Sequence, residues 1–79
     1  MTNIKAYDST IEGKRDFVKE VLSPLMRQAM TGWYGAEYEQ TPDGREWVYL
    51  LNSFGTRSKR IEVSANSNLA IVLEVFNNL

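Results

Sequence analysis

The sequence WYGAEYEQTPDGREWVYLLN, residues 33–52, decides the fold that this chain is predicted to adopt. Its first part alternates between apolar and polar positions, and residues 45–52 are rich in Trp, Val, Tyr and Leu. Between them, Pro42 presets the backbone angle of a turn and Gly44 accepts the left-handed conformation that closes it. We therefore predict two antiparallel strands, residues 33–40 and 45–52, joined by a three-residue loop with Thr41 opposite Arg45.

This register determines which side chains share a face of the sheet. One face would carry Tyr34, Ala36, Tyr38, Val48 and Leu50. The other would carry Trp33, Glu37, Glu39, Trp47, Tyr49 and Leu51. A slip of one residue would regroup them and place Tyr34, Tyr38, Trp47, Tyr49 and Leu51 together.

A helix is predicted before the hairpin. Residues 9–12 form a capping box with Ser9 as the cap, and apolar residues recur at three- and four-residue spacing from Phe17 to Met30. The apolar stripe stays in phase across Pro24, so we predict one helix kinked there rather than two. Gly32 is the predicted C-terminal stop.

After the hairpin, residues 59–64 alternate as a third strand, and residues 68–78 form a helix capped by Asn66 or Ser67. Residues 4–7 fit either a short edge strand or a tail. The predicted class is α+β, in the order helix, three-stranded antiparallel meander, helix (αβββα), with both helices on one sheet face and residues 1–79 as a single domain.

The composition limits how this domain is stabilised. The chain has 79 residues, no cysteine and no histidine, which excludes disulfides and zinc sites built on those residues. A core of this size supplies about 3–5 kcal/mol of net stability, and small domains often add a partner subunit. We therefore expect a homodimer, formed through the open sheet face or the C-terminal helix.

Localisation and membrane contact are also expectations from composition. The absence of cysteine and of a signal-peptide pattern favours the cytoplasm. The longest apolar run, residues 69–73, is too short to span a membrane, and the net charge of −1 gives no general attraction to anionic surfaces.

The central strand is apolar on both faces, whereas two helices on one side cover only one of them. We predict that the uncovered face binds a protein partner through Trp33, Trp47, Tyr49 and Leu51. The alternative is that the N-terminal segment, or a helix placed differently, covers this face.

No catalytic site is predicted. Without His or Cys, the commonest acid–base group and the best nucleophile are missing. Glu37 and Glu39 are interpreted as exposed strand carboxylates that pair with Arg45 across the hairpin. We expect a protein that is not an enzyme and that has no cofactor and no metal site.

Two groups of charges remain. Glu12, Asp16 and Glu20 follow one stripe of the first helix with Lys14 beside them, which is typical of a solvated helix face. A second group, Arg57, Lys59 and Arg60, opens the third strand. It either protects an edge strand from aggregation or, with the sheet aromatics, binds single-stranded nucleic acid.

The predicted element order is similar to that of double-stranded-RNA-binding domains. Those domains grip phosphates with a Lys pair that opens the last helix, and here residues 66–68, Asn-Ser-Asn, stand at that place. The order also resembles several small phage-encoded inhibitors of bacterial defence. The leading hypothesis is a non-enzymatic protein-binding or regulatory domain of phage or mobile-element origin, and the alternative is a nucleic-acid-binding module.

Overall fold

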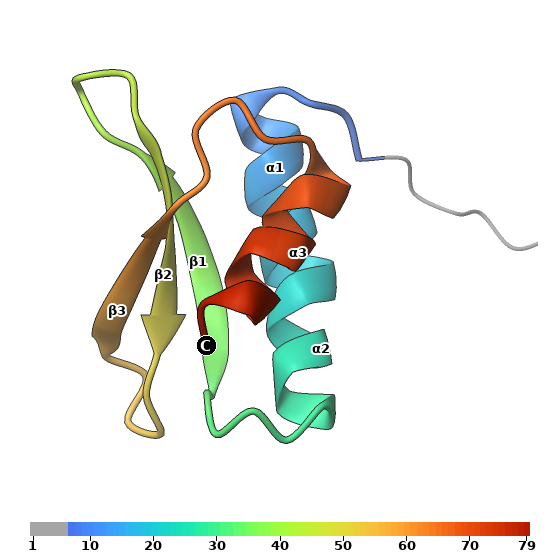
Figure 1. The fold of residues 1–79 in the computed structure, drawn as a ribbon, viewed down its shortest axis with the longest axis vertical. Helices are drawn as coiled ribbons and strands as arrows, with labels where there is room; N and C mark the ends of the chain where they lie inside the picture. The colour runs from blue at the N-terminus through green and yellow to red at the C-terminus, as the bar shows by residue number, and fades with distance from the viewer. Residues whose placement is uncertain (1–6) are drawn as a thin grey trace, which may run out of the picture.

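The structure, a computed structural model, describes residues 7–79 and confirms an α+β fold. A helical segment precedes a three-stranded antiparallel sheet in the order β1-β2-β3, and a C-terminal helix follows (Figure 1). The elements are α1 (Ile11–Phe17), η1 (Val18–Leu22), α2 (Ser23–Gln28), β1 (Gly35–Gln40), β2 (Glu46–Leu51), β3 (Arg57–Glu62) and α3 (Asn68–Asn77). Residues 4–6 of the N-terminal strand alternative lie outside the described residues.

The first helical segment runs through Pro24 without a break, as predicted. The π-helical segment η1 leads into α2, and the N–H of Ser23 bonds to the carbonyl of Val18, five residues back. Pro24 then falls in the first turn of α2, where a missing N–H is tolerated.

Both predicted ends of this segment were wrong. Thr10, not Ser9, is the cap, because its hydroxyl accepts the N–H of Gly13 at 3.0 Å. At the other end, Met30 rather than Gly32 takes the first left-handed position, with φ of 54°.

The first hairpin has the predicted loop and register. The N–H of Thr41 donates to the carbonyl of Arg45 at 2.9 Å, and Gly44 has φ of 88°. Glu39 pairs with Trp47 and Glu37 with Tyr49, so the one-residue slip is excluded.

The second hairpin repeats this turn. Asn52 donates its N–H to the carbonyl of Thr56 at 2.9 Å, and Gly55 has φ of 77°. The register against β2 shifts between Leu50 and Leu51, where the chain forms a bulge. The β3 strand begins at Arg57, two residues before the predicted strand of residues 59–64.

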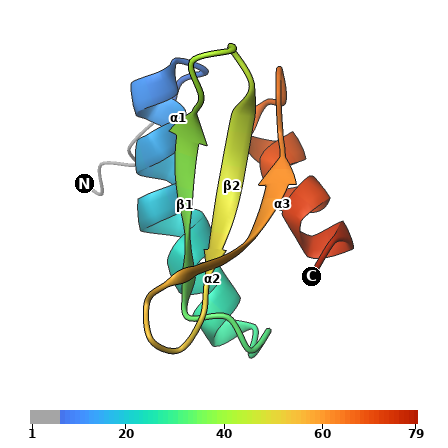
Figure 2. The same cartoon turned by 90° about the vertical axis from the view of Figure 1, so that its left-hand side faces the viewer.

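Helices and sheet share one apolar core. Figure 1 shows the sheet edge-on beside the helices, and Figure 2, turned by 90°, shows them behind it. The buried cluster contains Val18, Leu22, Met26, Ala36, Tyr38, Val48, Leu50, Ile61, Val63, Ile71 and Val75. The β1 strand approaches the first helical segment closely, because Ser23 Oγ accepts the N–H of Ala36 at 3.0 Å. Gly35 permits this contact, since an added Cβ would lie 2.2 Å from that oxygen.

A buried ionic cluster joins the elements at the other end of the sheet. Glu46 Oε1 accepts hydrogen bonds from Lys14 Nζ and Tyr38 Oη, both at 2.6 Å, and Glu46 Oε2 accepts the N–H of Ala65 at 2.9 Å. Lys14 is only 6% exposed, so its assignment to a solvated helix face was wrong.

These contacts shift the pKa values of Glu46 and Tyr38. Burial raises the pKa of the Glu46 carboxyl, but the hydrogen bonds from Lys14, Tyr38 and Ala65 lower it by more, so the pKa lies below its ordinary value. Burial and the adjacent Glu46 raise the pKa of Tyr38, which keeps its phenol a hydrogen-bond donor.

Replacement of Glu46 by glutamine is expected to destabilise the fold severely. It leaves Lys14 buried without a counter-charge, which typically costs about 3–5 kcal/mol. Urea denaturation followed by circular dichroism measures the loss, with the exposed Glu62→Gln as control. A triple variant, Lys14→Met with Tyr38→Phe and Glu46→Leu, should recover part of the stability because it removes the buried charges together. Equal stability of the two glutamine variants would contradict this role.

Stability should also fall in acid. Because the pKa of Glu46 is depressed in the folded state, its contribution is present above its ordinary value of 4.5 and is lost as pH falls through the folded pKa. Tyr38→Phe removes one hydrogen-bond donor to Glu46 and so brings the pKa of Glu46 closer to its ordinary value. The unfolding free energy of this variant should therefore decline less steeply below pH 4.5. Urea titrations at several pH values would test this against Tyr34→Phe, whose side chain lies elsewhere. Identical slopes for the two variants would argue against it.

Candidate interaction surfaces

The face of the sheet that points away from the helices is covered by arginine. Arg57 donates from Nε to Glu37 Oε1 at 3.0 Å and from Nη1 to Glu39 Oε2 at 2.8 Å. Its guanidinium carbon lies 4.1 Å from the ring centre of Tyr49. One side chain from β3 therefore crosses β2 and pairs with both carboxylates of β1.

A second arginine covers the other large aromatic of this face. The guanidinium carbon of Arg60 lies 4.1 Å from the ring centre of Trp47, and the indole N–H donates to Thr41 Oγ1 at 3.1 Å. Trp47 and Tyr49 lie on the predicted face, but both are half-buried. The expected exposed apolar face is instead a layer of guanidinium groups and carboxylates over two rings.

The other two predicted partner-binding residues are placed differently. Trp33 precedes β1 and packs against the core cluster on the helix side, so its assignment to the open face was wrong. Leu51 is buried next to the β-bulge and offers little surface to a partner.

The predicted basic cluster is not brought together as free cations. Hydrogen bonds from Arg57 to Glu37 and Glu39 raise the pKa of its guanidinium, and these carboxylates balance its charge. Lys59 pairs in register with the helix-facing Leu50 and donates to the carbonyl of Asn78. Within residues 7–79, Arg60 is the one cation of this cluster that lies on the open face and has no carboxylate partner.

The two strand carboxylates do not pair with Arg45. Glu37 and Glu39 both bind Arg57. The Nε of Arg45 lies 3.7 Å from Oδ2 of Asp43 instead. Within residues 7–79, no group of three metal-ligating side chains occurs. These carboxylates therefore act as acceptors for a guanidinium in this fold.

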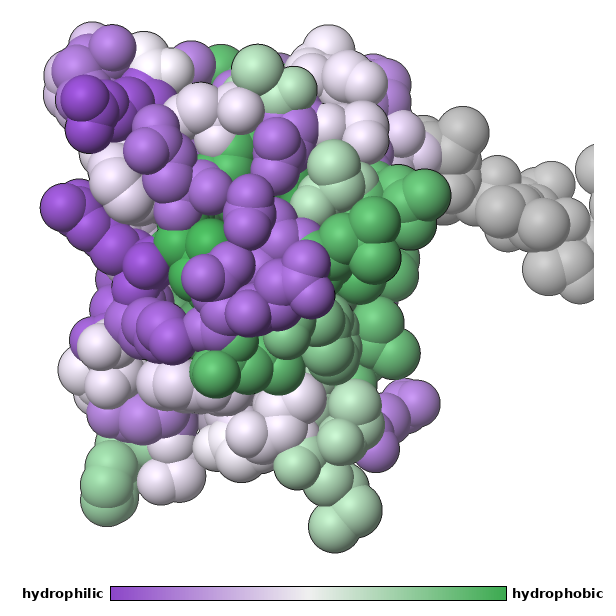
Figure 3. Space-filling model, viewed as in Figure 1, coloured by the Kyte–Doolittle hydropathy of each residue, from purple (hydrophilic) through white to green (hydrophobic). Residues whose placement is uncertain are grey.

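Exposed apolar surface gathers on the helix side instead. Leu69 and Leu73 of α3 are 70% and 58% exposed, and Leu25 of α2 is 40% exposed. Figure 3 shows hydrophobic surface on the helical side and hydrophilic surface over the sheet. The sequence carried a signal for this: α3 has apolar residues on more faces than one contact with a sheet uses.

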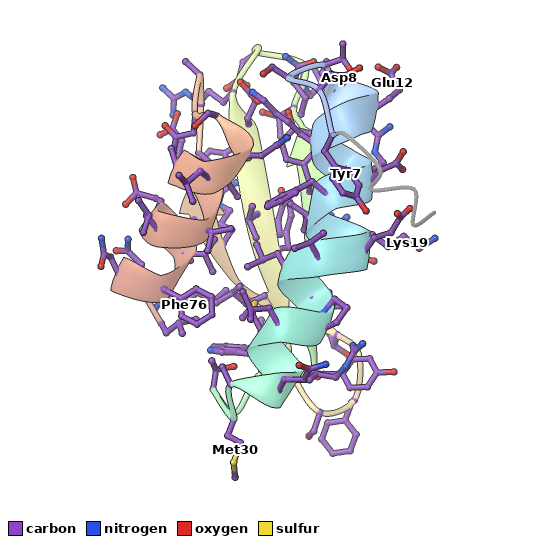
Figure 4. All side chains as sticks on the ribbon, turned by 90° about the vertical axis from the view of Figure 1, so that its right-hand side faces the viewer. Tyr7, Asp8, Glu12, Lys19, Met30 and Phe76 are labelled. Atoms are coloured by element: carbon purple, nitrogen blue, oxygen red, sulfur yellow. The ribbon has the colours of Figure 1, made fainter. Side chains whose placement is uncertain are left out.

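A second exposed group lies at one end of the molecule, where the α2–β1 and β2–β3 loops meet. Met30 and Phe54 are 89% and 90% exposed, and Figure 4 shows Met30 pointing away from the body of the protein. The sequence predicts Met30 as the end of the apolar stripe of the first helix, but α2 ends at Gln28, so Met30 falls in the following loop.

Comparison of the chain with protein-family profiles, curated proteins and solved structures finds no match. Among residues 7–79, no helix combines the length and apolar character needed to cross a membrane.

Trp47→Ala should leave the fold intact. Loss of a half-buried ring and its cation–π contact is expected to cost about 1–2 kcal/mol. Leu50→Ala, in the same strand but facing the core, should cost about 2–5 kcal/mol because it leaves a cavity. Urea denaturation of the two variants measures both, and a larger loss for Trp47→Ala would place its indole in the core.

Proposed function

We propose that this chain is a non-enzymatic protein-binding domain that works as a homodimer, with the outer face of α3 as the contact between the two copies. The observation that carries the proposal is the exposure of Leu69 and Leu73. They lie on the side of α3 opposite Ile71 and Val75, which are buried against the sheet. Isolated exposed leucines are ordinary, but two on one helical face beside half-buried apolar neighbours form a contact surface.

The charge distribution favours a second copy as the occupant of this face. Between residues 66 and 79 the only charged side chain is Glu74. Leu69, Val72, Leu73 and Phe76 follow the spacing of helices that pack side by side. Two α3 helices related by a two-fold axis can therefore pack without opposing like charges across the contact.

Self-association would also add stability that a domain of this size lacks. The chain has neither disulfides nor His- or Cys-based zinc sites, and its core belongs to a size class of marginal stability. In the proposed αβββα arrangement with both helices on one sheet face, dimerisation through α3 would cover the helix layer and leave the sheet face free.

The open sheet face is a weaker candidate for the homodimer contact. Glu37, Glu39 and Arg57 already satisfy one another there, and burial of such a network in an interface removes its hydration. Nucleic-acid binding remains the alternative, but Arg57 is neutralised and Lys59 lies on the other side of the strand. A cytoplasmic location and a phage or mobile-element origin stay predictions.

Sedimentation equilibrium tests the proposal directly. The natural chain should sediment as a dimer of the 9.1 kDa subunit at micromolar concentration. The double variant Leu69→Glu with Leu73→Glu should sediment as a folded monomer, because both side chains are exposed in the subunit and the new charges would oppose their copies.

Trp47→Ala serves as the matched control. It should remain dimeric if α3 is the contact, and it should become monomeric if the copies meet through the open sheet face. Circular dichroism of each variant verifies the fold. A single 9.1 kDa species at all concentrations of the natural chain would refute the homodimer.

A further inference from the structure

A groove opens at the end of the molecule where the α2–β1 and β2–β3 loops lie together. Both ribbon views show these loops at the same end (Figures 1 and 2). The groove has a volume of about 420 Å³ and is lined by Arg27, Met30, Gly32, Trp33, Tyr34 and Ser53. None of its lining residues belongs to α3.

Arg27 lines this groove, and two contacts with Tyr34 fix its guanidinium. Its Nη1 donates to the carbonyl of Tyr34 at 2.9 Å, and its guanidinium carbon lies 5.3 Å from the ring centre of the same residue. No carboxylate pairs with it in the part of the chain that the structure describes. A guanidinium positioned by a backbone carbonyl and a ring retains donors that suit a carboxylate.

The surrounding sequence contains no acidic residue that could compete for this arginine from nearby in the chain. Residues 21–36, which include α2 and the following loop, lack Asp and Glu, and so do residues 47–61, which include the second hairpin turn. The loop end therefore carries unpaired positive charge although the whole chain has a net charge of −1.

The apolar part of the site is presented by fixed backbone. Met30 occupies a left-handed position with φ of 54° after α2. Tyr34 is 52% exposed, and Trp33 packs on the core with one edge at the groove. Aromatic residues, Met and Arg are the types enriched at the centres of protein interfaces.

We propose that this loop-end groove binds a segment of a partner protein in which an apolar side chain stands next to an Asp or Glu. The apolar side chain would enter the groove beside Trp33 and Met30, and the carboxylate would pair with Arg27. This inference rests on the proposed protein-binding role and names the chemistry of the partner. It does not depend on the homodimer.

Other occupants fit less well. A second copy docked through the same end would bring two unpaired Arg27 side chains together. A nucleic acid would present repeated phosphates to one free guanidinium.

The test begins with a random twelve-residue peptide library displayed on phage and selected on the full chain. The selected sequences are expected to share an acidic residue beside Leu, Phe, Trp or Met. One such peptide, synthesised with an amidated C-terminus, is then titrated against a Trp47→Phe variant, in which Trp33 is the remaining indole. Its fluorescence should change on binding.

Matched variants locate the site. Arg27→Gln and a peptide with its acidic residue changed to the amide should each weaken binding about tenfold or more, the loss expected for a charged hydrogen bond. Met30→Ser should also weaken it. The double variant Leu69→Glu with Leu73→Glu should bind normally, so a failure of the dimer is distinguished from a failure of this site.

Several outcomes would overturn the inference. They are a selection without a shared sequence, a basic or uncharged consensus, full affinity in Arg27→Gln, and amide chemical-shift changes confined to another surface. Retention of the chain on phosphatidylserine vesicles or on oligo(dT), with no peptide bound, would assign the loop end to a different ligand.

Discussion

The carboxylate of Glu46 is the contact on which the arrangement of the elements depends. It joins Lys14 of α1, Tyr38 of β1 and the N–H of Ala65 between β3 and α3. A buried ion pair is costly unless its hydrogen bonds are satisfied, and here Lys14 and Tyr38 meet at the same oxygen. This requirement orients the first helix against the hairpin and holds the turn that leads into α3. Apolar packing alone would permit more than one such arrangement.

Aromatic residues are covered differently on the two faces of the sheet. On the helix side, Tyr38 lies in the core with its hydroxyl bound to Glu46. On the open side, Trp47 and Tyr49 lie beneath the guanidinium groups of Arg60 and Arg57. Long cationic side chains can cover rings while their charges stay near water. A three-stranded sheet can thus keep an aromatic face without a third layer.

The remaining exposed apolar side chains lie on the outside of α3 and at the loop end. These surfaces differ in charge, because α3 carries one glutamate and the loop end carries an unpaired Arg27. A helix face with few charges suits a second copy of itself, whereas a cationic groove suits an acidic partner. We propose the first surface for self-association and the second for a partner protein.

Local signals in the sequence determined the elements and the hairpin. Residues 41–44 prescribe a three-residue loop, and the loop sets the pairing of Trp47 with Glu39 because strand register follows from turn geometry. The stripe that stays in phase across Pro24 likewise predicted a continuous helix. Tertiary structure alone decided which charges meet: Lys14 with Glu46, and Arg57 with two glutamates across the sheet. Those partners lie 18 to 32 residues apart in the chain, and their meeting depends on how the helix and the third strand pack, which short-range spacing does not encode.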